Sequence, residues 1–450
     1  MTRSAHLEWQ LWARIKLDIS YSGKGRYVGL HEICRTRDEL NRALLRSGQC
    51  NLTIKIESSD VAMAYRLHEE AFRWNDLTYD LSKIPVTVED ALFGRGSNTH
   101  VMSRLAVVQN ASRSVSRNFT NWVALCRPRQ LSYVHHPGLC DLKALCVSRG
   151  TSSGRWSILQ KFEMVFEYSR NVPRQEADAN IVLNIIRAAN NTLTELVLKH
   201  ITCLFATTPV MLSNVTTLTL INVNGWWNFI GNSVTKLELD PFSAIPGQRS
   251  ILYPELVSLD YHSGDFSMGG SIRAPKLDTL VYRRTGKSPG GFLWEDANGG
   301  ATPSQTVAAL TPKTLCMHEV NVRYADLIRG LESLTEVEEV HFHSSKLRAG
   351  FLKPMADGRR ARPLLPRLRT MVVGLEAGGG RAEGSHGRET YTLLFENIVA
   401  ARRPGPDSRL KPAQFAQLRH LEVQWSKEMN GGTTFFLSDE SVERTRWDVQ

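Results

Sequence analysis

Two short stretches contain residue types that perform catalysis, and each lacks part of the pattern that its chemistry needs. The Gly-Lys-Ser sequence at 286–288 matches the end of a nucleotide-binding P-loop, but Val281 stands where the first glycine of that loop belongs. The glycines of 264–269 flank a serine with one residue too many for the turn that carries a hydrolase nucleophile. We therefore expect neither nucleotide binding nor hydrolysis here.

Five cysteines and histidines between 126 and 146 have ligand types that zinc prefers, namely Cys126, His135, His136, Cys140 and Cys146. They form neither a Cys-x-x-Cys pair nor a histidine pair four residues apart, so buried thiols are the simpler interpretation. His341 and His343 are two residues apart, and a strand would place both on one solvent-facing side. The sequence predicts no catalytic residue, no cofactor and no metal site, and we expect a protein that is not an enzyme.

A repeated apolar phrase, Leu-x-x-Leu-x-Leu or a close relative, indicates which elements position the remaining polar residues. Five copies begin 22, 19, 22 and 21 residues apart between 193 and 282, which is within the range of leucine-rich repeats. We expect the first, fourth and sixth positions of each copy to face a core. The copies are Leu193/Leu196/Leu198, Val215/Leu218/Leu220, Val234/Leu237/Leu239, Leu256/Leu259/Tyr261 and Leu277/Leu280/Tyr282.

The same phrase occurs less regularly on both sides of this stretch. It predicts an α/β fold, an irregular leucine-rich-repeat-like solenoid with a parallel sheet on one face and helices or loops on the other. The asparagine or cysteine that standard repeats place three residues after the third apolar position is missing, for example at Ile201 and Val223. The further copies are Met102/Leu105/Val107, Leu142/Leu145/Val147, Val337/Val340/Phe342, Leu368/Met371/Val373 and Leu418/Leu421/Val423.

Side chains between the inward positions should form the opposite, concave face, and there we place the partner-binding site. Its acids and bases are mixed, which favours a protein partner over nucleic acid, although a solvated sheet face without a partner remains the alternative. Trp226 and Trp227 are a possible aromatic anchor, and the alternative is that they fill the end or the underside of the solenoid. The predicted partner-binding residues are Thr219, Glu238, Asp240, Asp260, His262 and Arg283.

Alternation and helical spacing predict individual elements outside the regular copies. We expect strands at 14–19, 52–56, 76–81 and 162–166. Helices are expected at 31–46, 60–72, 113–125, 176–189 and 391–401. The basic, proline-interrupted stretch 348–369 is expected to be an exposed connection, and 374–387 a glycine-rich loop.

These patterns divide the chain into five segments. Residues 1–90 form an N-terminal repeat-like cap, 91–190 irregular repeats and 191–285 regular repeats. Residues 286–425 form irregular repeats with glycine-rich and basic insertions at about 345–411, and 426–450 a C-terminal cap or tail.

The charge of the chain is unevenly distributed. The formal net charge is +10, and the segments 91–140 and 346–411 contribute +6 and +8, so the remainder is negative. The two basic patches suggest an alternative function, a scaffold that contacts nucleic acid, or else an ordinary solvated surface. Seven scattered cysteines suit a reducing compartment, and the sequence contains neither a signal peptide nor a long apolar run. We expect a cytoplasmic or nuclear protein without a membrane partner.

Several short pieces between residues 9 and 80 resemble the region that follows the F-box in fungal F-box proteins, especially those of mushroom-forming fungi. The pieces are Leu11-Trp12-Ala-Arg-Ile15-Lys-Leu17, Leu40-Asn-Arg-Ala-Leu44-Leu45-Arg46-Ser47-Gly48, Leu52-Thr-Ile54-Lys-Ile56 and Phe72-Arg73-Trp74-Asn-Asp-Leu77. In that family these pieces begin the leucine-rich-repeat-like domain that recognises substrates of a cullin ubiquitin ligase. The resemblance implies an unidentified protein substrate as partner. Only ten residues precede Leu11, so we expect the F-box to be missing and docking to a Skp-type adaptor to be lost.

Overall fold

The computed structural model describes the following residues, to which all structural statements below refer: 14–18, 32–57, 59–81, 83–94, 101–109, 118–119, 122–123, 126–135, 156–166, 175–201, 208–241, 251–263, 272–284, 310–318, 328, 331–332, 334–345, 349–356, 364–375, 386–402, 416–425, 434–437 and 442–445. The chain divides into two units, residues 1–229 and residues 230–450.

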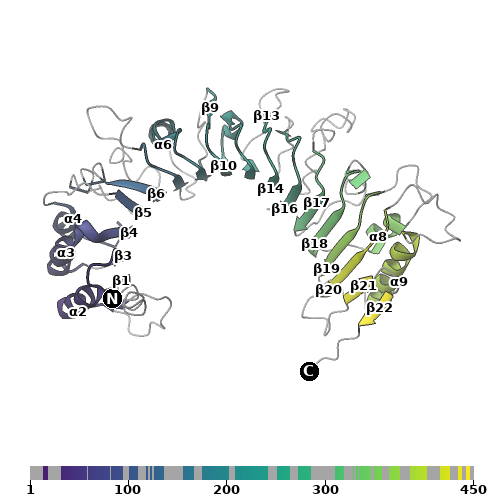
Figure 1. Cartoon of the computed structure of the whole chain (residues 1–450), viewed down its shortest axis with the longest axis horizontal. Helices are drawn as coiled ribbons and strands as arrows, with labels where there is room; N and C mark the ends of the chain where they lie inside the picture. Colours follow the sequence, from purple (N-terminus) through teal and green to yellow (C-terminus); the bar gives the residue numbers. More distant parts are fainter. Residues whose placement is uncertain are drawn as a thin grey trace. The chain divides into compact units, whose positions relative to one another are not determined.

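Unit 1 is built on a parallel sheet with the strand order β2-β1-β3-β4-β5-β6-β7-β8-β10. β3 pairs with β1, and from β4 onward each strand of this sheet lies beside the sheet strand that precedes it in the chain, as in a solenoid. Figure 1 shows the helices of this unit along one side of the strands. The strands are β1 (Arg14–Asp18), β2 (Glu32–Cys34), β3 (Leu52–Glu57), β4 (Trp74–Asp80), β5 (Val101–Gln109), β6 (Arg127–His135), β7 (Lys161–Phe166), β8 (Glu195–Lys199) and β10 (Thr217–Val223). The other elements are α2 (Arg37–Ser47), α3 (Val61–His68), η1 (Ala71–Arg73), α4 (Val86–Phe93), α6 (Gln175–Ala189), β9 (Val210–Met211) and η4 (Trp226–Asn228).

Unit 2 has a parallel sheet of the same kind, in the order β12-β14-β16-β17-β18-β19-β20. Its helices also lie on one side of the strands (Figure 1). The α/β solenoid fold predicted from the repeats is thus confirmed in both units. The sheet strands are β12 (Lys236–Pro241), β14 (Ser258–Ser263), β16 (Thr279–Arg284), β17 (Thr314–His318), β18 (Glu339–Ser345), β19 (Thr370–Leu375) and β20 (His420–Trp425). The other elements are α8 (Ala349–Ala356), α9 (His386–Ala401), the parallel pair β13 (Ile251–Leu252) and β15 (Ile272–Arg273), and the antiparallel pair β21 (Thr434–Leu437) and β22 (Val442–Thr445), while β11 (Phe229–Ile230) spans the boundary between the units.

Two columns of apolar side chains run along one face of the sheet in unit 2. The strand register aligns the fourth and sixth positions of successive repeat phrases, and no member of either column is more than 2% exposed. Stacking equivalent residues of neighbouring repeats therefore builds the continuous core on which a solenoid depends. One column is Leu237, Leu259, Leu280, Leu315, Val340, Met371 and Leu421, and the other is Leu239, Tyr261, Tyr282, Met317, Phe342, Val373 and Val423.

The backbone at the start of β14, β16, β17, β18, β19 and β20 repeats one hydrogen-bonding pattern. The amides of Val257 and Ser258 both donate to the Thr235 carbonyl, at 2.9 and 3.0 Å. In each following repeat, the carbonyl of the residue at the same position also accepts bonds from two successive amides of the next repeat. The amides at the start of these strands are therefore hydrogen-bonded. These carbonyls belong to Val257, Asp278, Lys313, Glu338 and Arg369.

In unit 1, polar side chains connect neighbouring repeats at the turns that precede the strands. The asparagine of standard leucine-rich repeats would lie at a different turn, three residues after the third apolar position. Asn190 donates to the Ser213 hydroxyl and accepts from the Ser213 amide, both at 3.0 Å, and Asn214 donates to the Asn191 carbonyl at 2.7 Å. Ile201, at the standard position, is buried instead. Its carbonyl accepts from the Asn224 amide of the next repeat at 2.8 Å, so a backbone bond connects the repeats there.

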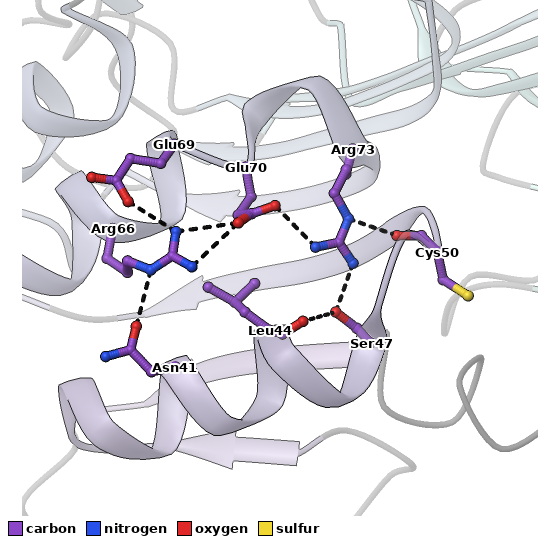
Figure 2. A network of polar contacts seen from close by, with 8 residues as sticks. All are labelled: Asn41, Leu44, Ser47, Cys50, Arg66, Glu69, Glu70 and Arg73. Carbon is purple, nitrogen blue, oxygen red and sulfur yellow. Dashed lines mark hydrogen bonds and ion pairs between the residues drawn. The ribbon is translucent and has the colours of Figure 1, made fainter.

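A buried guanidinium joins three elements near the N-terminus, as Figure 2 shows. Arg73, 5% exposed at the end of η1, donates to the Ser47 hydroxyl at 2.6 Å and to the Cys50 carbonyl at 3.0 Å. Its third contact is the Glu70 carboxylate at 2.9 Å. These partners use both terminal nitrogens and Nε, so the buried guanidinium is hydrogen-bonded at each of them, with the half-buried Glu70 carboxylate as its counter-charge.

Arg66 on α3 extends the same network toward the surface. It contacts the same Glu70 carboxylate at 3.2 Å and the Glu69 carboxylate at 2.9 Å, and it donates to Asn41 of α2 at 2.9 Å. Figure 2 shows the two arginines on either side of Glu70. The network thereby ties α2, α3 and η1 together through side chains as well as through their apolar faces.

The helix predicted at 31–46 is wrong in its first turn. Residues Glu32–Cys34 form β2, and α2 begins only after Thr36. The Thr36 hydroxyl accepts from the Glu39 amide, and the Glu39 carboxylate accepts from the Thr36 amide, which makes a capping box. This cap fixes the start of α2 at residue 37, so residues 32–34 lie outside the helix and pair with β1.

The exposed connection predicted at 348–369 is also wrong in part, because it contains α8. Leu352 and Met355 of this helix are at most 2% exposed. Arg402, which directly follows α9, donates to the carbonyls of Leu364 and Leu365 at 2.7 and 3.0 Å. Leu365 has a positive φ of 47°, so the guanidinium stabilises an uncommon backbone turn before β19.

Several other predictions can be compared with the described residues. The strands at 14–19, 52–56, 76–81 and 162–166 and the helices at 60–72, 176–189 and 391–401 are present with boundaries shifted by a few residues. β6, β17 and the β21–β22 pair were not predicted. The phrase at 142–147, most of the helix at 113–125, most of the loop at 374–387 and the stretches 264–269 and 286–288 lie outside the described residues, while the ends of the predicted loop belong to β19 and α9.

Candidate functional site

The unit 2 sheet has a second face, opposite the two apolar columns, which we call the open face. Alternate residues of each strand point to this side because successive side chains of a strand point to opposite faces. Figure 1 places the described helices of the unit on the other side. The open face consists of Lys236, Glu238, Asp240, Ser258, Asp260, His262, Thr279, Val281, Arg283, Thr314, Cys316, His318, Glu339, His341, His343, Thr370, Val372, Gly374, His420 and Glu422.

An ion-pair cluster lies on β12, β14 and β16. The His262 imidazole lies 3.4 Å from the Glu238 carboxylate and 3.5 Å from that of Asp260, distances of an ion pair rather than of a short hydrogen bond. Arg283 Nε contacts both oxygens of Asp260 at 2.9 Å. The side chains remain accessible, with Glu238 36% and Arg283 41% exposed, so the cluster forms part of the surface.

The carboxylates of this cluster determine the protonation of its histidine. The contact with Glu238 raises the pKa of His262, and the charges of Asp260 and Asp240 raise it further against the opposing effect of burial. Asp240 is only 8% exposed, and this burial raises its own pKa. The contact with Asp260 raises the pKa of Arg283, which stays charged.

Three imidazole rings form a second cluster on β17 and β18. The His318 and His343 rings lie with centroids 4.6 Å apart and an angle of 19° between their planes. The His341 and His343 rings are 5.7 Å apart at 24°. His341 also contacts the Glu339 carboxylate at 2.7 Å. Three nearly parallel flat rings therefore lie beside a carboxylate on the open face.

The surroundings of His343, the middle ring of this second cluster, disfavour protonation of its imidazole. Burial lowers the pKa of His343, and the charges of His341 and Arg283 lower it further. Burial also raises the pKa of the Cys316 thiol, as does the nearby Glu339 carboxylate. Cys316 is the register neighbour of His341, so two groups at the centre of the cluster are uncharged near neutral pH.

The structure brings together five of the six predicted partner-binding residues. Glu238, Asp240, Asp260, His262 and Arg283 are neighbours on three adjacent strands of unit 2. Asp240 is buried, so its contribution to binding would be through its neighbours. The sixth residue, Thr219, lies on β10 of unit 1 and is only 7% exposed.

Trp226, one residue of the predicted aromatic anchor, does not have the exposure that an anchor needs. Trp226 is 1% exposed in η4 and packs edge-to-face on Trp227 with ring centroids 6.2 Å apart. Trp227 itself is half-buried. Trp226 thus packs inside unit 1 and is not accessible to a partner.

Sequence reasoning missed part of the open face. Cys316 and His318 lie on β17, a strand without a complete repeat phrase, and His420 and Glu422 on β20 were not considered as site residues. Alternation in Thr-Leu-Cys-Met-His at 314–318 is the signal that could have located β17. The prediction that His341 and His343 share one face of a strand is confirmed, since both lie on the open face.

The residues considered for metal binding do not assemble into a site within the described part of the chain. Cys126 is buried with its thiol 3.4 Å from the Met102 sulfur. Among the described residues, no group of three histidine, cysteine or carboxylate side chains has an arrangement that could hold a metal ion.

Comparison with known proteins does not assign the chain. No family model, no curated protein and no solved structure matches it. None of the described helices has both the length and the apolar character that crossing a membrane requires.

Proposed function

We propose that this chain is a non-enzymatic protein-interaction solenoid that recognises a protein partner through its open face. The F-box resemblance of residues 9–80 extends the proposal, with the chain acting as the substrate-recognition part of an F-box-type receptor of a cullin ubiquitin ligase. The proposed compartment is the cytoplasm or the nucleus.

The contrast between the two faces of the unit 2 sheet supports this proposal most directly. The apolar columns are at most 2% exposed, whereas Glu238, Arg283 and Glu339 on the open face are 36%, 41% and 41% exposed. These polar side chains stand in register on hydrogen-bonded strands, so their backbone is already ordered and binding of a partner costs little backbone entropy. Rigid strands that present varied, accessible polar groups suit recognition of another protein.

Site-specific photocrosslinking tests this proposal. A photoreactive amino acid would replace Thr314 or Thr370 on the open face, and Lys276 or Glu255 on the exposed turns before strands as matched controls. We expect discrete adducts with the same partner protein from both open-face positions and weaker or no adducts from the controls. Equal labelling from all four positions, or none from positions 314 and 370, would contradict the proposal.

The receptor part of the proposal needs a separate measurement. If the captured partner is a ubiquitin-ligase substrate, its half-life after translation is blocked should lengthen when the gene for this chain is deleted. An unchanged half-life of the partner would exclude the receptor role, and the chain would then be a protein that only binds this partner.

Nucleic-acid binding through 91–140 and 346–411 stays the alternative proposal. In unit 1, the aromatic rings within the first patch belong to the core, since Phe93, Phe119 and Trp122 are at most 4% exposed and their rings pack against one another. They are therefore covered and cannot stack on bases. Salt-dependent retention of the chain on RNA or DNA would favour this alternative.

A further inference from the structure

The open face carries a charge opposite to that of the chain. Carboxylates outnumber permanent cations on it by five to two, although the formal net charge of the whole chain is +10. The potential of a sheet face acts on an approaching partner before contact, and complementary charge accelerates correct association. The carboxylates are Glu238, Asp240, Asp260, Glu339 and Glu422, and the cations are Lys236 and Arg283.

Two of these carboxylates lie beside imidazoles. Glu339 contacts His341 at 2.7 Å and Glu422 contacts His420 at 3.6 Å, with exposed fractions of 41% and 31%. An imidazole is a weaker and pH-dependent counter-charge compared with a guanidinium. Both carboxylates are partly exposed, so they contribute to the negative charge that a cationic group of a partner would meet.

The stacked imidazole rings lie between these carboxylates and the Asp260–Arg283 pair. They offer a second kind of contact to a cationic group of a partner. His318 and His343 are half-buried, so part of each ring is accessible. The flat guanidinium of an arginine stacks on aromatic faces and simultaneously donates hydrogen bonds to carboxylates. A partner arginine that lies on the rings would reach Glu339 on the strand that carries His341 and His343.

Both observations indicate the chemistry of the occupant. We propose that the open face binds a basic, arginine-containing segment of a protein partner, with its guanidinium groups against the rings of His318, His341 and His343 and its charges facing Glu339, Glu422 and Glu238. This inference rests on the proposed function, because it names the class of partner that the same face would recognise. A segment rich in carboxylates or phosphates would meet like charge there.

The size of the face determines the length of a suitable probe. Its seven strands are about 4.8 Å apart, so the face is about 29 Å wide, a distance that an extended segment of about nine residues spans. A peptide of about twelve residues therefore covers the face completely.

Fluorescence anisotropy with three synthetic peptides tests the inference on the full chain. The peptides share a glycine-serine background of about twelve residues with four arginines, four glutamines or four glutamates, each with the same dye. We expect the arginine peptide to bind at about pH 7.5, and the glutamine and glutamate peptides to bind at least tenfold more weakly.

A pair of matched double variants assigns the binding to the open face. Glu339→Lys/Glu422→Lys reverses two charges on the face, and Glu255→Lys/Glu336→Lys reverses two exposed carboxylates elsewhere in unit 2. Both variants add the same positive charge to the chain, so they change its general repulsion of the peptide equally. We expect the first to weaken binding of the arginine peptide about tenfold or more, and the second to have much less effect. Glu339→Gln/Glu422→Gln is the milder variant if the lysine pair fails to fold.

The possible outcomes separate this inference from the function on which it rests. Absence of arginine-peptide binding, or equal weakening by both double variants, would overturn the inference. Preferential binding of the glutamate peptide, with a gain in the Glu339→Lys/Glu422→Lys variant, would also overturn it but would retain the open face as a binding surface. Failure of the proposed function itself would appear independently, as the absence of crosslinks from positions 314 and 370.

Discussion

Two histidines of the open face have surroundings of opposite charge, although both lie on strands of the same sheet. His262 faces the carboxylates of Glu238 and Asp260, whereas His343 stacks on two other imidazoles. The pKa is raised at the first position and lowered at the second. Identical side chains should therefore change the stability of unit 2 in opposite directions as the pH falls.

At His262, the folded protein holds the proton more tightly than the unfolded chain, whose histidines titrate near pH 6.5. The charged groups that face it are Glu238 and Asp240 on β12, Asp260 on its own strand and Arg283 on β16. Its stabilising contribution is fully present below about pH 6.5 and is lost as the pH rises through the folded-state pKa. In His262→Gln, the melting temperature should fall more between about pH 8 and about pH 5.5 than in the wild type. A pH profile identical to that of the wild type would contradict this prediction.

At His343, the unfolded chain takes up the proton more readily than the folded protein. The titratable groups around it are His341 on its own strand, His318 and Cys316 on β17, and Arg283 on β16. Stability is therefore lost as the pH falls through about 6.5 toward the lower folded-state pKa. His343→Asn should remove this loss, so its melting temperature should fall less than that of the wild type over the same pH range. Differential scanning fluorimetry measures both variants, and a steeper fall for His343→Asn would reject the assignment.

At the scale of elements, the Arg73 network makes the packing of α2, α3 and η1 depend on one buried charge. Arg73→Met should lower the free energy of unfolding of unit 1 by about 2–4 kcal/mol, because it leaves Glu70, the Ser47 hydroxyl and the Cys50 carbonyl without this donor. Arg66→Met removes a guanidinium that contacts the same Glu70 but is 22% exposed, and it should cost about 1 kcal/mol or less. Denaturant unfolding measures both, and equal losses would show that burial of the charge is not decisive.

Local patterns predicted the elements whose signals lie within a few residues. The alternation of Leu280 and Tyr282 predicted β16, and Asp60 marked the start of α3, where its carboxylate accepts from the Ala62 and Met63 amides. The elements that were missed depend on distant packing. Pro354 and the surrounding arginines suggested a connection at α8, but the helix is stabilised by burial of Leu352, which no local pattern of charge reveals.

At the scale of the whole molecule, the candidate site could be predicted only where repeat spacing is regular. The phrases at 234, 256 and 277 placed Glu238, Asp260 and Arg283 on neighbouring strands, and the structure brings these three together. The ring cluster required the register between β17 and β18, which aligns His318 with His343. These residues are separated by a segment of irregular length, so periodicity alone could not pair them.

The apolar columns give a test of the repeat register for the entire array of unit 2. Leu237 is 2% exposed and lies in register with Leu259 of the next repeat. Leu237→Asp places a carboxyl group in the column and removes apolar contacts, so it should lower the stability of unit 2 by about 3–5 kcal/mol. Because each repeat supports its neighbours, protection of backbone amides from hydrogen exchange should fall on β12 and β14 together. Lys236→Asp, one residue away on the exposed open face, is the control and should change stability by less than about 1 kcal/mol. Equal effects of the two substitutions would mean that the strand is not oriented with Leu237 inward, and the repeat register would be wrong.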